Sequence, residues 1–257
     1  MADKSSFFIW YDLMTGDVAA AEAFYGNVVG WKIADSGMPG MKYSILKAGD
    51  TDVGGIMGFP PEMPKDRRRP IWGGYIGVGD VDAMAKRVEK AGGMTCNPPE
   101  DIPGVGRFAA MADPHGAFFY LFKPNSDEKP KPEVANAPGR VGWRELHAGD
   151  GAKAWDFYSG LFGWEKQMAM DMGPMGTYQT YDLGNNQGGG MMTKTPDMPQ
   201  AMWHYYFNVE AIDAAMERVK AAGGKIVMEP MEVPGGQWAM SCADHEGAFF
   251  GLLAPKR

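Results

Sequence analysis

Two similar segments, beginning at Trp10 and at Trp143, each carry an acidic side chain near their start, and the second also carries a histidine. Asp12 follows Trp10 by two residues. In the second segment, Glu145 follows Trp143 at the same spacing, and His147 comes two residues later. Alternate side chains of a strand share a face, so each acid lies on the side of its tryptophan. A partly buried carboxylate there can act as a general base or accept a hydrogen bond from a ligand. The alternative is an acid that accepts from the backbone or an arginine.

Two histidines of the second segment have no counterpart in the first. In the first segment, Met14 occupies the position equivalent to His147, and Gly73 occupies the position equivalent to His204. Histidine titrates near neutral pH, so His204 can serve as a general acid or base, and His147 can contact a ligand. The alternatives are a core histidine at 204 and a surface histidine at 147. We predict Glu145 and His204 as the catalytic residues if the chain is an enzyme.

The two segments belong to a long internal repeat. Residues 10–31 match residues 143–164 at a constant shift of 133, and ten of the 22 aligned residues are identical. Residues 71–93 match residues 202–224 at a shift of 131. A repeat of this length indicates two copies of one folding unit. The residues between the copies are rich in proline and charge, which is typical of a linker. We predict a domain at 1–123, a proline-rich linker at 124–138 and a domain at 139–257.

Each copy has the pattern of two β-α-β-β-β modules. An alternating apolar stretch predicts a strand, and Asp17 or Asp150 then precedes a helix as its N-cap. A second strand and helix follow, and after them a strand, a tight turn and a strand. The apolar stripe of the first helix in each copy, which we expect in the core, is made by Ala21, Phe24, Tyr25 and Val28 or by Ala154, Phe157, Tyr158 and Leu161. The fold class is therefore α+β.

Composition restricts the partners and the location. The net charge of −7 argues against a nucleic-acid surface, because phosphate binding needs a basic face. The chain lacks an apolar run of about 18 residues and a signal-peptide start, so we expect no membrane partner and a cytoplasmic location. Cys96 and Cys242 show no metal or disulfide spacing, and we expect both to be reduced and structural. We expect a small-molecule ligand and either a monomer with an internal pseudo-dimer or a homodimer.

An ordered set of motifs runs through both copies. It consists of W-x-[DE]-L-x-x-x-D, then FY and GW, then AGG, and later D-x-x-G-A-F-F. The set resembles the vicinal oxygen chelate superfamily, which includes glyoxalase I, bleomycin-resistance proteins and extradiol dioxygenases. The resemblance covers nearly the whole chain outside the linker. It implies two tandem glyoxalase-like domains whose mixed sheets curl into cups, with a site inside each cup.

The resemblance also implies a divalent metal in each cup, held by histidine, glutamine or glutamate. The second ligand falls within the stretches GGIMGF and GGGMMTK, which contain no histidine or acid. The other three positions fall on Trp10, Gly73 and Tyr120 in the first copy and on Trp143, His204 and Gly251 in the second. A metal centre normally needs at least three protein ligands, and His204 is the one candidate. We therefore predict no cofactor, with a divalent metal as the alternative.

The retained aromatic residues suggest what the cups bind. We predict that the chain binds a small aromatic or hydrophobic molecule without the usual metal, as bleomycin-resistance proteins do. One alternative is a metal-dependent or acid/base lyase, isomerase or dioxygenase of the same superfamily. Another is an assembly protein whose cups are filled by side chains. If one cup is active, we expect it to be the second. The predicted ligand-binding residues are Trp10, Asp12, Trp143, His147, Tyr120 and Tyr206.

Overall fold

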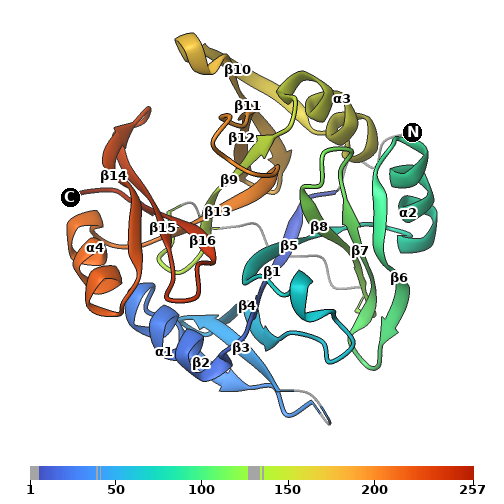
Figure 1. Cartoon of the computed structure of the whole chain (residues 1–257), viewed down its shortest axis with the longest axis horizontal. Coiled ribbons are helices and arrows are strands. Elements are labelled where there is room, and N and C mark those ends of the chain that lie inside the picture. The colour runs from blue at the N-terminus through green and yellow to red at the C-terminus, as the bar shows by residue number, and fades with distance from the viewer. Residues whose placement is uncertain (1–5, 39, 41, 127–133, 135) are drawn as a thin grey trace. The chain divides into compact units, whose positions relative to one another are not determined.

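The fold consists of four β-α-β-β-β modules, as the sequence predicts. The computed structural model describes residues 6–38, 40, 42–126, 134 and 136–257. The helices are α1 Val18–Val28, α2 Val81–Lys90, α3 Gly151–Phe162 and α4 Ile212–Ala221, and two short 3-10 turns are η1 Lys65–Arg67 and η2 Gly173–Met175. Figure 1 shows these elements along the chain.

The strands form two open eight-stranded sheets, one from each copy of the repeat. The first sheet has the order β2-β3-β4-β1-β5-β8-β7-β6, and the second repeats it as β10-β11-β12-β9-β13-β16-β15-β14. The first-sheet strands are β1 Phe8–Thr15, β2 Lys32–Asp35, β3 Tyr43–Ala48, β4 Thr51–Gly58, β5 Ile71–Gly77, β6 Met94–Ile102, β7 Gly106–Ala112 and β8 Phe118–Pro124. The second-sheet strands are β9 Val141–Ala148, β10 Glu165–Asp171, β11 Thr177–Gly184, β12 Gln187–Thr193, β13 Met202–Asn208, β14 Lys225–Val233, β15 Gln237–Ala243 and β16 Phe249–Ala254.

Helix formation follows from local sequence, as expected. Asp17 caps α1 by accepting from the backbone N–H of Ala20, and Asp150 caps α3 by accepting from the first backbone N–H groups of that helix. Gly163, at a φ of 72°, ends α3 in the left-handed conformation that favours glycine. Every residue of the two predicted apolar stripes is buried. The stripes therefore supply the core side of α1 and α3.

The described chain forms two compact units, and each unit combines modules from both copies of the repeat. Unit 1 comprises Met1–Trp10, Gly74–Val134 and Arg144–Trp203, and unit 2 comprises Tyr11–Gly73, Ala135–Trp143 and His204–Arg257. In unit 1, α2 packs beside α3, and in unit 2, α1 packs beside α4 (Figure 1). Part of the predicted linker, residues 127–133 and 135, lies outside the described residues. The exact boundaries of the two sequence domains stay a prediction.

The repeated Tyr residues of α1 and α3 hold each unit together. In unit 2, Trp72 donates its indole N–H to the Tyr25 hydroxyl over 2.9 Å, and that hydroxyl donates to Asp244 over 3.1 Å. In unit 1, the Tyr158 hydroxyl accepts from Trp203 over 3.1 Å and faces Asp113 at 3.4 Å. These residues are buried, and a buried polar group is costly unless it is paired. The occurrence of a tyrosine at the same position of α1 and α3 is thus explained by its hydrogen bonds in the core.

An arginine closes the end of a neighbouring helix in each unit. Arg87 of α2 donates to the carbonyl of Leu161 in α3 over 3.1 Å. Arg218 of α4 donates to the carbonyl of Val28 in α1 over 2.9 Å. The last carbonyls of a helix have no partner within the helix, so these contacts satisfy groups that would otherwise need water. The helix pairs are therefore joined by polar as well as apolar contacts.

The two cysteines differ in their exposure to solvent. Both cysteines are free thiols; Cys242 is buried, but Cys96 is exposed. The prediction of a structural role is therefore wrong for Cys96, because it lies on the edge strand β6, where alternate residues face solvent.

Among the described residues, no helix has the length and apolar character needed to cross a membrane.

Candidate functional site

The acid of the first sheet is buried against a tyrosine. Asp12 on β1 pairs in register with Gly55 on β4, and the Tyr43 hydroxyl donates to the Asp12 Oδ1 over 2.8 Å. A Cβ at position 55 would collide with the Tyr43 ring and would lie 2.7 Å from the Asp12 carboxylate. Glycine is therefore required for the close approach of the two side chains. The Asp12 carboxylate thus accepts a hydrogen bond from a tyrosine, whereas the alternative named the backbone or an arginine as the donor.

The acid of the second sheet lies in a matching position and has a histidine two residues beyond it. Glu145 on β9 pairs with Gly190 on β12, and His147 pairs with Met192. The β11–β12 register places Tyr178 beside Met192, and Tyr178 pairs in turn with Met170. Residues that pair across strands share a face of the sheet. We call the face formed by Glu145, His147, Met192, Tyr178 and Met170 the acid-bearing face.

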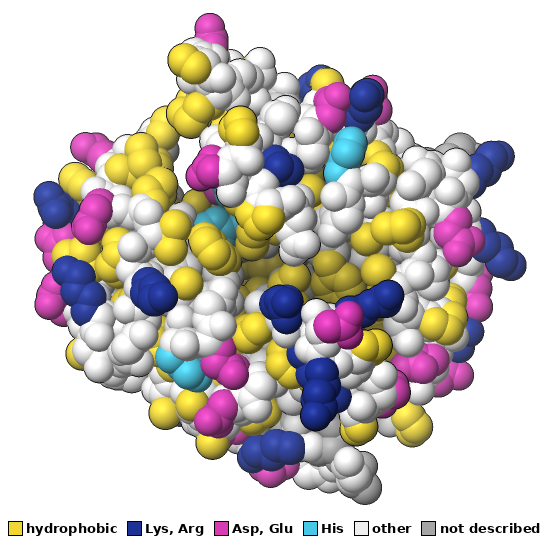
Figure 2. Space-filling view, in the orientation of Figure 1, with side chains coloured by type: hydrophobic (Ala, Val, Ile, Leu, Met, Phe, Trp, Pro, Cys, Tyr) yellow, Lys and Arg dark blue, Asp and Glu magenta, His cyan; other side chains and the backbone are white. Residues whose placement is uncertain are grey.

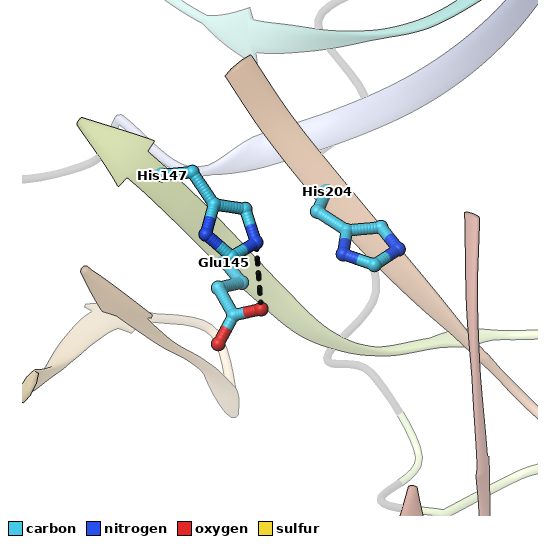
Figure 3. Close-up of side chains that lie close together, drawn as sticks. All are labelled: Glu145, His147 and His204. Carbon is cyan, nitrogen blue, oxygen red and sulfur yellow. Dashed lines mark ion pairs between the residues drawn. The ribbon is translucent and has the colours of Figure 1, made fainter. Parts of the chain in front are cut away.

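Glu145 and His147 form the polar end of the acid-bearing face. The Glu145 Oε2 lies 3.2 Å from the His147 Nε2, which makes an ion pair when the imidazole is protonated (Figure 3). The Glu145 and His147 side chains are 11% and 18% exposed, so each keeps a small contact with solvent. They extend from one strand at the spacing that strand geometry requires for side-by-side placement. The expectation that Glu145 and His147 share a face is thus confirmed.

His204 joins this pair from β13, the strand next to β9 in the sheet. One ligand-type atom from each of Glu145, His147 and His204 lies within 4.8 Å of the others (Figure 3). The His204 side chain is 3% exposed, and its ring lies 4.6 Å from the ring of Tyr206. The Phe249 ring lies farther away, at 6.3 Å. A carboxylate and two imidazoles in this arrangement can exchange protons with a ligand or bind a cation.

The predicted aromatic residues lie in two apolar clusters. In unit 1, Trp10 packs against the cluster of Tyr75, Tyr120 and Ala110, where the two tyrosine rings stack at 4.1 Å. In unit 2, Trp143 packs against the cluster of Tyr206, Ala239 and Leu253. The Tyr206 hydroxyl lies 3.4 Å from the Ser241 hydroxyl. Both Tyr120 and Tyr206 are buried, so their first role is packing.

Apart from His204, the positions at which the resemblance implies metal ligands carry no side chain suited to a metal. In the second sheet, the Tyr206 ring lies directly over Gly251, so a side chain at 251 would collide with it. In the first sheet, Tyr120 at the equivalent position is stacked on Tyr75. Indole, glycine and a stacked phenol offer no suitable donor. Glu145 and His147, two and four residues after Trp143, are the donors that stand beside His204 instead.

Sequence reasoning missed the tyrosine and glycine that accompany each acid. Tyr43 and Gly55 in the first sheet correspond to Tyr178 and Gly190 in the second, both at a shift of 135. A Cβ at Gly190 would collide with the Tyr178 ring, as at Gly55 with Tyr43. The signal was present as a tyrosine and a glycine at matched places in both copies. This signal was missed because the shift of 135 between the two pairs differs from the shifts of 133 and 131 that relate the longer repeated segments.

Methionines extend the apolar surface beyond the acid-bearing face. Met168 on β10 is 55% exposed, and Met172 and Met175 beside the η2 turn are also exposed. Figure 2 shows hydrophobic side chains gathered on this β10–β11 hairpin, at the top of the view. Methionine is flexible and polarizable, so it adapts to irregular apolar shapes. The second sheet therefore combines an acid-histidine cluster with adaptable apolar side chains.

The chain belongs to the glyoxalase, bleomycin-resistance protein and dioxygenase superfamily, whose family model matches residues 8–120 and 140–252. It is 34% identical to the candidate glyoxylase CFP32 of Mycobacterium tuberculosis over 96% of this chain and 94% of that protein. It is 32% identical to the anthracycline biosynthesis protein DnrV of Streptomyces peucetius over 95% and 91%.

A solved structure has the same fold at low sequence identity. This is the 2,2',3-trihydroxybiphenyl 1,2-dioxygenase of Sphingomonas wittichii, with a TM-score of 0.67 and 14% identity. The match covers 97% of this chain and 90% of the dioxygenase chain. The tandem glyoxalase-like domains and the α+β class predicted from sequence are thereby confirmed.

Proposed function

We propose that the chain binds a small aromatic or hydrophobic molecule on the acid-bearing face of the second sheet. The observation that carries the proposal is the row His147, Met192, Tyr178 and Met170, which runs across four neighbouring strands with Glu145 beside it. Glu145 and His147 form its polar end, and Met192, Tyr178 and Met170 form its apolar part. A ligand with one polar edge and a flat apolar body would match both.

The apolar part of the row suits a flat ring system. Met192 and Met170 flank Tyr178 in the pairing register, so a thioether lies on either side of a phenol ring. Thioethers contact aromatic rings favourably and adjust to different outlines. The exposed Met168 and Met172 next to the row provide further apolar surface. Such a face favours a broad class of planar molecules over one exact shape.

The polar end of the row suits a hydroxyl or carbonyl group on the ligand. The Glu145 carboxylate accepts from a hydroxyl, and the His147 imidazole donates to or accepts from a neighbouring oxygen. Relatives from two Streptomyces, 31% and 32% identical to this chain, are named for anthracycline biosynthesis. Anthracyclines are flat polycyclic molecules that carry hydroxyl and carbonyl groups. A hydroxylated polycyclic quinone is therefore the ligand class we propose.

A binding titration with a dihydroxyanthraquinone tests the proposal. We expect saturable one-to-one binding that quenches tryptophan fluorescence. Replacing Glu145 with Gln removes a charged acceptor and should weaken binding about tenfold, since a hydrogen bond to a charged group contributes about 1.5 kcal/mol or more. Asp12→Asn, the matched change in the first sheet, should leave the affinity unchanged. Equal affinities for all three proteins, or no saturable binding, would reject this site.

The closeness of His204 to the Glu145–His147 pair favours a second candidate function. Three groups that can carry protons within 4.8 Å of one another suit acid/base catalysis, as in a lyase or isomerase. Liquid chromatography coupled to mass spectrometry of hydroxylated quinones incubated with the chain would separate isomers as well as cleavage products and so reveal turnover. Glu145→Gln and His204→Gln should each reduce the rate at least about 100-fold. Unchanged rates in both variants would exclude this mechanism.

A further inference from the structure

We infer that the end of the β10–β11 hairpin binds one Cu⁺ ion through methionine sulfur. The donors are Met170, Met172 and Met175, with Met168 as the fourth. Together they form the pattern M-x-M-x-M-x-x-M over residues 168–175, which we call the methionine segment. The segment lies entirely within unit 1. The inference concerns sulfur chemistry and does not depend on the binding of a quinone.

Methionine is the one large apolar residue type at this hairpin end. Of the nine large apolar side chains that are exposed in the described chain, three lie in the methionine segment, and they are 37% to 55% exposed. Figure 2 shows them at the top of the view. An apolar contact surface can use leucine, isoleucine, valine or aromatic residues, and none occurs in residues 165–176. Sulfur is what distinguishes methionine from these residues, and thioether sulfur is a soft donor that selects Cu⁺.

The strand and the turn bring the donors together. Met170 and Met172 are alternate residues, so they face one side of the hairpin and start roughly 6.7 Å apart. The backbone N–H of Met175 donates to the Met172 carbonyl over 3.3 Å, which folds the chain back within the η2 turn. The methionine side chain is unbranched and has three rotatable bonds. Neighbouring sulfurs can therefore meet on one ion.

Hydrogen bonds hold the backbone beneath these side chains. The Met168 N–H donates to the Thr180 hydroxyl over 2.9 Å, and the Gln179 amide donates to the Met168 carbonyl over 3.1 Å. Gly173 and Gly176, with φ values of 61° and 81°, adopt the left-handed conformation that the turn requires. A backbone that is already ordered reduces the entropy lost when the donors gather on an ion.

The charge of the segment suits a cation. Residues 168–177 contain one charged side chain, the carboxylate of Asp171. Thioethers are neutral, so a bound Cu⁺ ion keeps its charge, and a neighbouring carboxylate attracts it.

The first copy of the repeat lacks these donors. At the shift of 135 that relates Tyr43 to Tyr178, the four methionine positions carry Ile33, Asp35, Gly37 and Gly40. Met38 and Met41 of the first copy fall at the positions of the two turn glycines of the second. We therefore expect one ion per chain, although the fold is duplicated.

Cu⁺ binding by the full chain tests the inference. The Cys96→Ser chain is used because an exposed thiol is also a soft donor, and Cu⁺ is supplied with ascorbate in the absence of oxygen. Competition with a chromogenic Cu⁺ chelator should show one bound ion per chain. Met172→Leu and Met175→Leu keep the apolar volume and remove a sulfur, so each should weaken binding at least about tenfold. Met94→Leu, which removes an exposed methionine of β6, is the matched control and should leave the affinity unchanged.

Methyl NMR with Ag⁺, a redox-inert substitute for Cu⁺, identifies the donors in a chain that retains every methionine. One equivalent should shift the Met172 and Met175 methyl signals and leave the Met94 signal in place. Three results would each overturn the inference: no competition with the chelator, undiminished Cu⁺ binding in both leucine variants when circular dichroism shows them folded, or a shift at Met94 as large as at Met172. Loss of Cu⁺ binding in His147→Gln, with full binding in the leucine variants, would assign the ion to imidazole instead.

Discussion

The Tyr43 hydroxyl donates a 2.8 Å hydrogen bond to the Asp12 carboxylate. At the position equivalent to Asp12, the second sheet carries Glu145, whose carboxylate lies 3.2 Å from the His147 imidazole. Both sheets thus carry an acid at this position, and they differ two residues further on, where the first sheet has Met14 and the second has His147. Each acid pairs with a glycine that is covered by a tyrosine ring, and the second acid stands in addition beside imidazoles that can bind protons or a cation.

Tyr43→Phe should destabilise the chain by about 1–3 kcal/mol, because it removes a hydrogen-bond donor from the buried Asp12 carboxylate. Urea unfolding measures the loss. The double variant with Asp12→Asn provides the control, since the two changes should be coupled and not additive. Additive effects would contradict a direct interaction between the two side chains.

Tyr25→Phe and Tyr158→Phe should each destabilise the chain by about 2–3 kcal/mol. Each removes the hydroxyl that accepts from a buried indole N–H and faces a buried aspartate, so two polar groups lose a hydrogen bond. Chemical unfolding of both variants measures the effect. Losses below about 0.5 kcal/mol would show that water replaces the hydroxyl at little cost.

Stability should fall in acid partly through Glu246. Partial burial alone would raise the pKa of this carboxyl, but hydrogen bonds from Thr15 and from the backbone of Gly16 and Asp17 outweigh it and hold the pKa below the ordinary 4.5. A lowered pKa in the folded state contributes stability above the unfolded value, and this is lost as pH falls through the folded pKa. Glu246→Gln should therefore destabilise the chain at pH 7 and much less at about pH 3. An equal effect at both values in urea unfolding would contradict the assignment.

A thiol reagent should label one cysteine in the folded chain. Cys96 is exposed, whereas burial, with a smaller contribution from Glu229, raises the pKa of the Cys242 thiol to about 12. The thiolate is the reactive form, so Cys242 should react only after unfolding. Cys96→Ser should abolish the labelling of the folded chain. Rapid labelling that persists in this variant would show that Cys242 is accessible.

Much of the fold could be predicted because its determinants are local. The caps Asp17 and Asp150 and the apolar stripes of α1 and α3 are patterns within a dozen residues, and all were found as expected. The contacts of Arg87 with Leu161 and of Arg218 with Val28 could not be predicted. They join helices far apart in sequence, and no local pattern identifies the partner of a surface arginine.

The candidate site was predictable within a strand and not between strands. Strand periodicity placed Glu145 and His147 on one face because their spacing is two residues. The approach of His204 depends on β9 and β13 being neighbours in the sheet; no local pattern reveals this, and the prediction that Glu145 and His204 act together relied on the superfamily resemblance. His204 was the one metal candidate because only the ligand positions implied by the resemblance were compared, and Glu145 and His147 lie two and four residues beyond the first of them.

The central claim is that ligand binds on the acid-bearing face of the second sheet, and methyl NMR of methionine-labelled protein tests it most directly. Met170→Leu, Met192→Leu and Met57→Leu variants assign three resonances; Met57 is the first-sheet counterpart of Met192. During titration with a dihydroxyanthraquinone, the Met170 and Met192 methyl signals should shift together and saturate, while the Met57 signal stays in place. Shifts at Met57 alone, or saturable binding with no shift at Met170 and Met192, would contradict the claim.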